Sequence, residues 1–479
     1  MKNNIFCILF ILCMVALFAP LLQSLTQWPK CEALQGVVVG QPMPKLTLKS
    51  YRDGSFQTGT EKHLQYHFGF RPPIIRLYNQ YLWDFYGKTY VSPGTLTIGK
   101  DGWLYEPWFV EDYYQSLSYT FSSDPESMAK MFEAEAKRVY QLQHILHDCG
   151  TELLVALLPG KDLIYPEHLP DNTQYTKEKK ITARGFFGPE YDRLGVNHVD
   201  VEQWFVQMKD TADFLLFPQT GTHWSMMAAA YAADSLFRYM EDLKGCNMHN
   251  LIIGERHVED AHKPDKDLES LLNLIRPLKR LPLHYAEIET DDDTTAIKPA
   301  LLTIGDSFWW NINTQIPISK MFSVYPFWYY NSTVYDNRVA HTYSVKDTDV
   351  VSELLTADFV LLSYCSSQLY NLNNNFTKQA LIACCYDPEE TDSIRNVLRT
   401  RIIEDKEWMA SIENHAKNNS QELGQAIEGT IDYVINLCPE KYFPALADSI
   451  PSKRSRHFVE VFQKKESTSL LKEISENIQ

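Results

Sequence analysis

Short, continuous apolar runs alternate along the chain with longer stretches of helical periodicity. The runs at 151–161 (TELLVALLPGK), 300–312 (ALLTIGDSFWWNI) and 358–364 (DFVLLSY) are typical of strands buried on both faces, and 195–201 predicts a shorter strand. Helical patterns occupy 127–148, the segment through Trp204 and 226–243. This alternation predicts an α/β fold with a mainly parallel sheet, whose sites collect at the carboxyl ends of the strands.

Before these elements, residues 5–25 (IFCILFILCMVALFAPLLQSL) carry no charge and follow Lys2. As a helix this segment reaches roughly 30 Å, close to the thickness of the hydrocarbon layer. A cleaved signal peptide is the alternative, but no small-residue cleavage site follows, whereas Trp28 and Lys30 suit an interfacial anchor. We expect a retained anchor at 1–30, with the rest of the chain outside the cytoplasm.

The remaining chain divides by pattern into three parts. Residues 31–60 read as a linker, 61–385 as the main domain and 386–479 as charged, periodic surface helices. At the start of the main domain two helices flank the turn FGFRPP at 68–73, and GKDGWLY at 99–105 predicts a turn feeding a short aromatic strand.

The amino-acid composition excludes several classes of protein and of partner. Hydrophobic residues make up 44% of the 479 positions, which excludes wholesale disorder, and a formal charge of −16 argues against nucleic acid as a partner. The nine cysteines show no metal-ligand spacing, so neither a metal nor a cofactor is predicted. The pair Cys384-Cys385 is either redox-active or, as the pattern favours, apolar filling at the end of a buried helix.

Two motifs carry candidate chemistry. In GDS, Gly305 permits a sharp strand-to-helix turn, Ser307 is a candidate nucleophile, and N–H groups at the helix start would stabilise an oxyanion; the alternative is a helix N-cap. In TGTHWS (220–225), His223 is a candidate general base whose ring Trp224 would hold; the alternative is a packed structural histidine.

Taken together and in order, these motifs resemble a known family. GKDGWLY, LLPGKDLIYPEHLP, the Thr-x-x-His-Trp element and IGDSF are similar to motifs of the alginate O-acetyltransferases, SGNH hydrolase-like proteins, and FGFR (68–71) and KDLESLLNL (266–274) fit as well. The resemblance covers about residues 55–385. It implies a flavodoxin-like three-layer fold with a parallel sheet in circularly permuted order, in which the histidine precedes the serine.

The resemblance also implies residue roles. Ser307 would take the acetyl group as a serine ester, and His223 would deprotonate Ser307 and later the acceptor hydroxyl. The family places an Asp two residues before the His, and here that position is Gly221. Three explanations stay open: another carboxylate (Asp306 or Asp213) orients the ring, a carbonyl or water does so, or the protein is a non-catalytic member.

Further candidates each have a structural alternative. Lys161 and Asp162 could touch substrate or form a strand-end turn, and HVEDAH (257–262) could bind a metal but reads better as a solvated loop. Arg71 could contact substrate or have a buried structural role, and Tyr330, in the aromatic run YPFWYY, could contact substrate or pack within a strand. Asn331 is a candidate oxyanion donor. Trp224 and Gly305, within the two motifs, are the remaining candidates for substrate contact.

The expected function is therefore O-acetylation of an exported or cell-envelope polysaccharide by a single-pass inner-membrane protein with a periplasmic domain. By resemblance, a membrane-bound O-acyltransferase supplies the acetyl group. The alternatives are an acetyl-esterase using the same serine and histidine, and an inactive polysaccharide-binding or assembly protein.

Overall fold

A seven-stranded sheet forms the centre of the molecule in the computed structural model, which describes residues 2–36, 40, 42–91, 94–114, 124–171, 182–419 and 421–478. Five neighbouring strands are parallel, and two short antiparallel strands extend one edge. In spatial order the strands are β12 (Tyr343–Ser344), β11 (Thr333–Tyr335), β10 (Phe327–Tyr329), β9 (Leu301–Gly305), β13 (Phe359–Cys365), β3 (Glu152–Leu158) and β4 (His198–Asp200).

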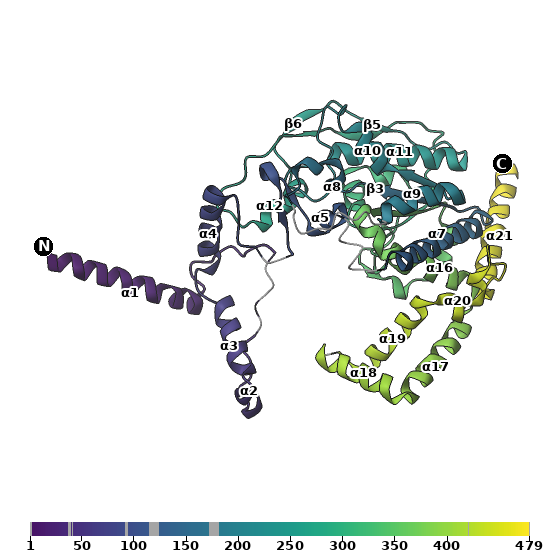
Figure 1. Cartoon of the computed structure of the whole chain (residues 1–479). Helices are drawn as coiled ribbons and strands as arrows, with labels where there is room; N and C mark the ends of the chain where they lie inside the picture. The colour runs from purple at the N-terminus through teal and green to yellow at the C-terminus, as the bar shows by residue number, and fades with distance from the viewer. Residues whose placement is uncertain are drawn as a thin grey trace.

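Helices cover both faces of this sheet, so the predicted three-layer α/β architecture is confirmed (Figure 1). Alternate side chains of β3 enter opposite cores, Val155 on one face and Ala156 on the other. One face packs against α7 (Pro125–His147), α9 (Ala183–Leu194), α15 (Val350–Thr356) and α16 (Phe376–Cys385). The other packs against α10 (Val201–Met208), α11 (Met226–Lys244) and α13 (Trp309–Gln315).

The start of α11 is fixed by its own sequence. Ser225 is the N-cap, and its hydroxyl accepts a hydrogen bond from Ala228 N at 3.2 Å while donating to the Leu215 carbonyl at 2.6 Å. The alanine-rich helix that follows ends at Gly245, which has φ of +62°. Because the cap is Ser225, His223 lies just before the helix, on the connection that leads into it.

Smaller elements occupy the loops around the sheet. Short helices are α5 (Pro107–Tyr113), α8 (Lys161–Ile164), α12 (Asp267–Leu271) and α14 (Ile318–Met321). Three two-stranded ribbons pair β1 (Thr97–Ile98) with β2 (Leu104–Tyr105), β5 (Leu251–Ile253) with β8 (Ile288–Thr290), and β6 (His257–Glu259) with β7 (Leu283–Tyr285). The predicted turn and aromatic strand at 99–105 correspond to the first ribbon.

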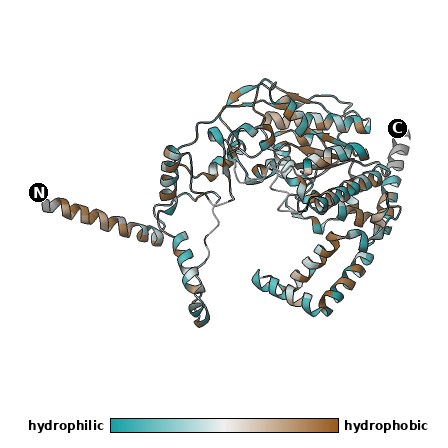
Figure 2. Cartoon of the chain, viewed as in Figure 1, coloured by the Kyte–Doolittle hydropathy of each residue, from teal (hydrophilic) through white to brown (hydrophobic). Residues whose placement is uncertain are grey.

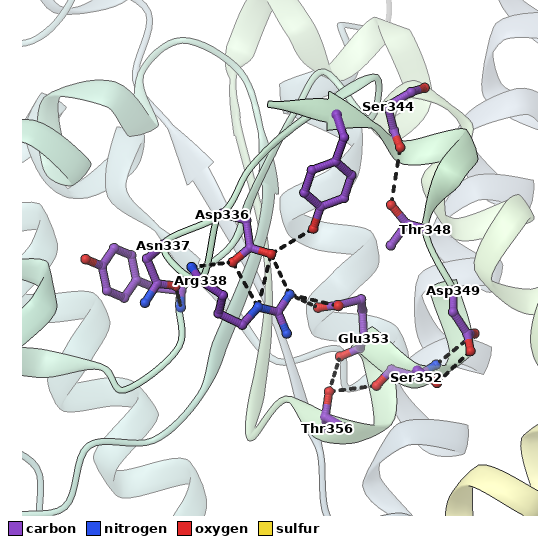
Figure 3. Close-up of polar contacts among 11 residues, drawn as sticks. Asp336, Asn337, Arg338, Ser344, Thr348, Asp349, Ser352, Glu353 and Thr356 are labelled. Atoms are coloured by element: carbon purple, nitrogen blue, oxygen red, sulfur yellow. Dashed lines mark hydrogen bonds and ion pairs between the residues drawn. The ribbon is translucent and has the colours of Figure 1, made fainter. Parts of the chain in front are cut away.

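Figure 3 shows the polar network that holds the antiparallel edge of the sheet to the helix layer. The Asp336 carboxylate, just after β11, accepts hydrogen bonds from the Arg338 guanidinium and from the Tyr343 hydroxyl at 2.7 Å. Arg338 also makes an ion pair with Glu353 of α15 at 2.8 Å. These contacts fix the loop between β11 and β12.

The N-terminal segment forms α1 (Lys2–Thr26), α2 (Leu48–Arg52), α3 (Ser55–Tyr66) and α4 (Arg71–Tyr86). α1 projects away from the body and is strongly hydrophobic; its residues Ile5–Thr26 are long and apolar enough to cross a membrane, as a signal sequence also would be (Figures 1 and 2). Part of the predicted linker is helical, because Thr47 and Ser50 form a capping box that starts α2.

The C-terminal segment forms α17 (Pro388–Glu404), α18 (Lys406–Asn418), α19 (Leu423–Leu437), α20 (Pro439–Tyr442) and α21 (Arg456–Ile478). α17, α18 and α19 project as an arm, and α21 returns along the body (Figure 1). Phe443, Leu446 and Phe458 are buried in the same core as the α7 and α16 face of the sheet. The C-terminal helices therefore share a hydrophobic core with the main domain.

Candidate active site

Ser307 lies on the tight turn between β9 and α13. Gly305 ends the strand, and a Cβ there would collide with the Ser363 carbonyl of the neighbouring β13, so the sheet leaves room only for glycine. The buried Asp306 carboxylate accepts hydrogen bonds from Phe308 N at 2.9 Å and Cys365 N at 2.7 Å. Asp306 thereby fixes the turn that presents Ser307.

His223 faces Ser307 across the carboxyl end of the sheet. Its Nε2 lies 2.9 Å from Ser307 Oγ, the separation of a hydrogen-bonded base and nucleophile. The ring packs edge-on against Phe308 at 5.0 Å between centroids, and the side chain keeps 21% of its surface exposed. The two motifs, 84 residues apart in sequence, form one serine–histidine pair.

The carboxylate beside the other ring nitrogen belongs to Asp267, the first residue of α12. Its Oδ2 lies 3.6 Å from His223 Nδ1, within ion-pair distance. Its Oδ1 accepts hydrogen bonds from Thr222 N and Leu268 N, both at 2.8 Å. Burial acts to raise the pKa of Asp267, but the His223 ring and the two N–H donors outweigh it and hold this pKa below its ordinary value.

Gly221, where the resembled family has Asp, has no space for a side chain. A Cβ on Gly221 would lie 2.6 Å from the Asp265 carbonyl oxygen and 2.7 Å from Pro218 Cγ. The segment 265–267 that fills this space is the one that carries Asp267. Ser307, His223 and Asp267 therefore have the arrangement of a catalytic triad, with the acid supplied from a different loop.

Neither carboxylate that the sequence offered as the partner of His223 contacts its Nδ1. Both oxygens of Asp306 bind backbone N–H groups, as described above. Asp213 is exposed and makes a bidentate ion pair with Arg256. The assignment of Asp306 as the residue that orients the histidine is corrected by this geometry in favour of Asp267.

Lys161 supports the histidine loop from within the core. Its fully buried ammonium donates to the carbonyls of Leu104 at 2.7 Å, Gln219 at 3.0 Å and Gly221 at 2.8 Å. Burial lowers the pKa of Lys161 well below its ordinary value, and the charge of Asp267 partly opposes that shift. Lys161 is thus neither a surface substrate contact nor an ordinary turn residue; it holds the backbone two residues before His223.

Two predicted substrate contacts, Tyr330 and Asn331, follow β10 with left-handed backbone angles, φ of +47° and +49°. Tyr330 lies near the site: burial raises the pKa of its phenol, and nearby Ser307 partly opposes that rise. Asn331 turns the other way, donating to the Asn374 carbonyl at 3.1 Å and to Gln379 Oε1 at 2.8 Å. The position predicted for an oxyanion donor therefore binds the α16 side of the molecule instead.

Trp224 and Arg71 lie away from the reacting atoms. The Trp224 side chain is fully buried and packs against Phe308 at 5.6 Å between centroids, so it backs the site from the core and does not face a substrate. Arg71, at the start of α4, lies 5.0 Å over the Tyr66 ring among the N-terminal helices. Its contacts in the described ranges include none of Ser307, His223 or Asp267.

Sequence reasoning missed two acids at the site. Asp267 lies in KDLESLLNL, a segment that resembles the family but whose pattern predicts no chemical role. Glu106, the N-cap of α5, directly follows GKDGWLY; burial raises its pKa, while the charge of nearby His223 opposes the rise. Only the folding of these loops against the His223 connection brings the two carboxyl groups to the site.

Within the described parts of the chain, no group of three or more His, Cys, Asp or Glu side chains is arranged to hold a metal ion. In HVEDAH, His257 and His262 each contact Glu259 at 2.8 Å. The predicted loop is corrected in part, because His257–Glu259 form the exposed strand β6, while His262 lies in the loop that follows. Cys384 and Cys385 are free thiols buried at the end of α16, as the apolar-filler interpretation predicted.

Comparison with known proteins bears on this arrangement. Residues 96–307 match the family model of the SGNH hydrolase-like domain of acetyltransferase AlgX. A probable alginate O-acetylase AlgJ of Pseudomonas aeruginosa is 26% identical over 228 residues, 46% of this chain and 50% of that protein. The corresponding protein of Pseudomonas syringae pv. tomato is 25% identical over 187 residues, 38% of this chain and 42% of the relative. The chain thus spans half or less of the length of these relatives.

Among solved structures, the O-acetyltransferase domain of Pseudomonas putida AlgJ is 14% identical, with a TM-score of 0.38 over 60% of this chain and 98% of that domain. Pseudomonas aeruginosa AlgX is 11% identical, with a TM-score of 0.37 over 59% of this chain and 68% of that protein. The segment matched by the family model contains His223, Asp267 and Ser307. The resemblance predicted from the motifs is confirmed by the family model: residues 96–307 are similar to the SGNH hydrolase-like domain of acetyltransferase AlgX.

Proposed function

We propose that this protein transfers acetyl groups, through an ester on Ser307, to hydroxyl groups of an exported or cell-envelope polysaccharide. One observation carries the proposal: His223 Nε2 lies 2.9 Å from Ser307 Oγ, while Asp267 lies on the Nδ1 side of the same ring. This is the geometry of a serine nucleophile activated by an oriented general base. The relatives, probable alginate O-acetylases, point to a polysaccharide as acceptor.

In the acylation half, Ser307 Oγ attacks the carbonyl carbon of an acetyl donor as its proton passes to His223 Nε2. Asp267 stabilises the resulting imidazolium and fixes the ring orientation. The leaving group of the donor then takes the proton from His223, and the acetyl group remains on Ser307 as an ester.

The developing oxyanion needs a nearby donor. Phe308 N is engaged by Asp306, whereas Ser307 N–H makes no hydrogen bond within the described ranges and is free for this role. In the second half, a sugar hydroxyl gives its proton to His223 and attacks the acetyl ester. The collapse of that intermediate returns the proton to Ser307 and releases the acetylated sugar.

The donor and the location follow from the same proposal. By its resemblance to the family, the chain would receive acetyl groups from a membrane-bound O-acyltransferase in the inner membrane. α1 would anchor the chain there by a single span, with the catalytic domain on the periplasmic side. We further propose that Tyr330, near Ser307, and Glu106, near His223, line the acceptor side of the site.

The test uses the full chain in detergent with a chromogenic acetyl ester as donor and alginate oligosaccharides as acceptor. Free acetate and oligosaccharide-bound acetyl are measured separately. Ser307→Ala should abolish both products, whereas Ser319→Ala, at an exposed serine beyond α13, should leave both unchanged.

Each result has a distinct meaning. Acetylated oligosaccharide lost in Ser307→Ala supports the transferase. Free acetate alone, even at high acceptor concentration, replaces the proposal with an acetyl-esterase that uses the same residues and water. Equal rates in Ser307→Ala and the unmodified chain would rule out the serine mechanism.

A further inference from the structure

One face of α4 is apolar, aromatic and unpartnered within the described residues. This apolar stripe consists of Ile74, Leu77, Tyr78, Tyr81 and Phe85, which recur at the spacing of one helical face. Each of these residues keeps between 48% and 72% of its surface exposed. Tyr81 and Phe85 are 5.0 Å apart between ring centroids. A soluble surface does not normally expose so continuous a stripe of large apolar side chains.

The opposite face of α4 binds the body of the molecule. Asn79 donates to the Leu272 carbonyl at 2.8 Å, and Gln80 Oε1 accepts from Ile275 N at 3.2 Å and Arg276 N at 3.0 Å. Trp83 packs with the small core under α12. At about 100° per residue, the apolar stripe lies on the side of the helix turned away from these contacts.

The N-terminus of α4 is joined to the outer end of α1. Phe70 N donates to Gln23 Oε1 at 3.2 Å, and Gly69 packs directly against the Pro20 backbone. Counted from Ile5, Pro20 and Gln23 lie in the last turns of the apolar span, at the depth where a bilayer gives way to its headgroups. Figure 1 shows α4 running across the end of α1, with the body on the side opposite to α1.

Charge favours the same environment. Residues 27–90 contain eight Lys and Arg against four Asp and Glu, a formal charge of +4 in a chain whose formal charge is −16. Tyr, Phe and Leu beside basic residues are typical of helices that lie in the interface of a bilayer with anionic lipids.

From these observations we infer that α4 lies flat on the outer surface of the membrane that α1 crosses, with its apolar stripe among the acyl chains and headgroups of an anionic bilayer. This inference rests on the proposed anchoring by α1. α4 also contacts the segment that directly follows α12, and the first residue of α12 is Asp267. The interfacial helix therefore sets the height of the active site above the bilayer.

The test uses the full chain in nanodiscs of phosphatidylethanolamine and phosphatidylglycerol, with the photoreactive amino acid benzoylphenylalanine at single positions. Lipid adducts are measured by mass spectrometry at Leu77, Tyr81 and Phe85. Tyr433, an exposed aromatic residue on the C-terminal arm, is the matched control, and Leu12 inside α1 reports the anchor. We expect at least about fivefold more lipid adduct at the α4 positions than at Tyr433.

Adducts at Leu12 with none above the Tyr433 level on α4 would overturn the interfacial helix and leave the anchor intact. No adducts at any position would overturn both. In native membranes, cross-links from α4 to a protein instead of lipid would show that a partner covers the stripe, and would also overturn the inference.

A second experiment distinguishes membrane binding by α4 from catalysis. The triple substitution Leu77→Gln, Tyr81→Gln and Phe85→Gln should leave hydrolysis of a soluble acetyl ester unchanged, because these side chains lie outside the active site. The same protein should give at least about threefold less lipid adduct at Tyr78. Unchanged adduct formation at Tyr78 would contradict the inference.

Discussion

At the scale of single residues, the glycine two positions before His223 determines where the acid can come from. The backbone of Asp265 occupies the space that a side chain on Gly221 would need. Asp267 follows on the same segment, and its carboxylate lies beside His223 Nδ1. A glycine at 221 is thus compatible with a complete triad, and the non-catalytic explanation of this residue loses its main support.

Asp267→Asn is expected to lower kcat/KM for acetyl transfer by about 10² to 10⁴, because an amide can neither fix the productive tautomer nor stabilise the imidazolium. Initial rates with the chromogenic ester measure this. Asp213→Asn, at the exposed acid paired with Arg256, is the control and should retain full activity. A rate for Asp267→Asn within twofold of the unmodified chain would remove Asp267 from the mechanism.

Gly221→Asp, which restores the family's motif residue, is expected to reduce activity and not to rescue Asp267→Asn. The added side chain meets the Asp265 carbonyl and Pro218, and overpacking of this kind costs about 1–3 kcal/mol of stability. Thermal unfolding and ester hydrolysis of the single and double variants measure both effects. Recovery of activity in the double variant would mean that position 221 can still supply the acid.

At the scale of elements, a buried acidic cluster joins the end of β3 to its neighbours. Glu202, on α10, accepts a hydrogen bond from Gly160 N at 3.1 Å and pairs with Arg184 of α9 at 2.8 Å. Burial raises the pKa of Glu202 to about 8, although these two partners oppose the shift. Burial likewise raises the pKa of nearby Asp112 to about 6.

This cluster predicts a pH dependence of stability. Between about pH 4.3, the ordinary pKa of Glu, and about pH 8, the folded chain holds a proton on Glu202 that the unfolded chain has lost. The free energy of unfolding should therefore fall as pH rises through this window, by up to about 1.4 kcal/mol per pH unit from this group.

Glu202→Gln should flatten that slope, as measured by chemical denaturation at several pH values from 5 to 8. Glu126→Gln, at an exposed position of α7, serves as the control and should leave the slope as it is. The same steep slope in Glu202→Gln would show that the pH dependence has another origin.

The elements themselves were largely predictable from the sequence. The uninterrupted apolar runs predict β3, β9 and β13, and the alanine-rich periodic stretch predicts α11; all four are present in the structure. The directions in which side chains point could be predicted less well from the sequence, because they depend on tertiary packing. Trp224 follows His223 in sequence but points into the core, and Asn331 follows Tyr330 but turns to α16. Asp267 lies 44 residues beyond His223, so no local pattern joins them.

At the scale of the whole molecule, the chain combines an apolar N-terminal helix, a three-layer α/β domain and C-terminal helices that complete the core of this domain. Leu398, Ile402, Phe443, Leu446 and Phe458 from the C-terminal segment are buried with the sheet face that α7 and α16 cover. The sequence division at residue 385 reflects a change in surface pattern, while packing joins both sides of it.

Deletion of residues 386–479 is therefore expected to destroy cooperative folding, because it exposes this face of the core. Deletion of residues 2–26 should leave the three-layer α/β domain folded, since α1 is joined to the rest of the chain at Gly69 and Phe70 of the N-terminal segment. Soluble yield and thermal unfolding distinguish the two. A C-terminally truncated chain that unfolds cooperatively near the midpoint of the full protein would show that the domain folds alone.

The central claim, a covalent acetyl group on Ser307, is tested most directly by peptide mass spectrometry of the full chain quenched in acid during turnover of an acetyl donor. We predict one added acetyl group on the peptide that contains Ser307, absent in Ser307→Ala and strongly reduced in His223→Ala. Acetylation of another residue at equal level in Ser307→Ala, with turnover preserved, would contradict the account.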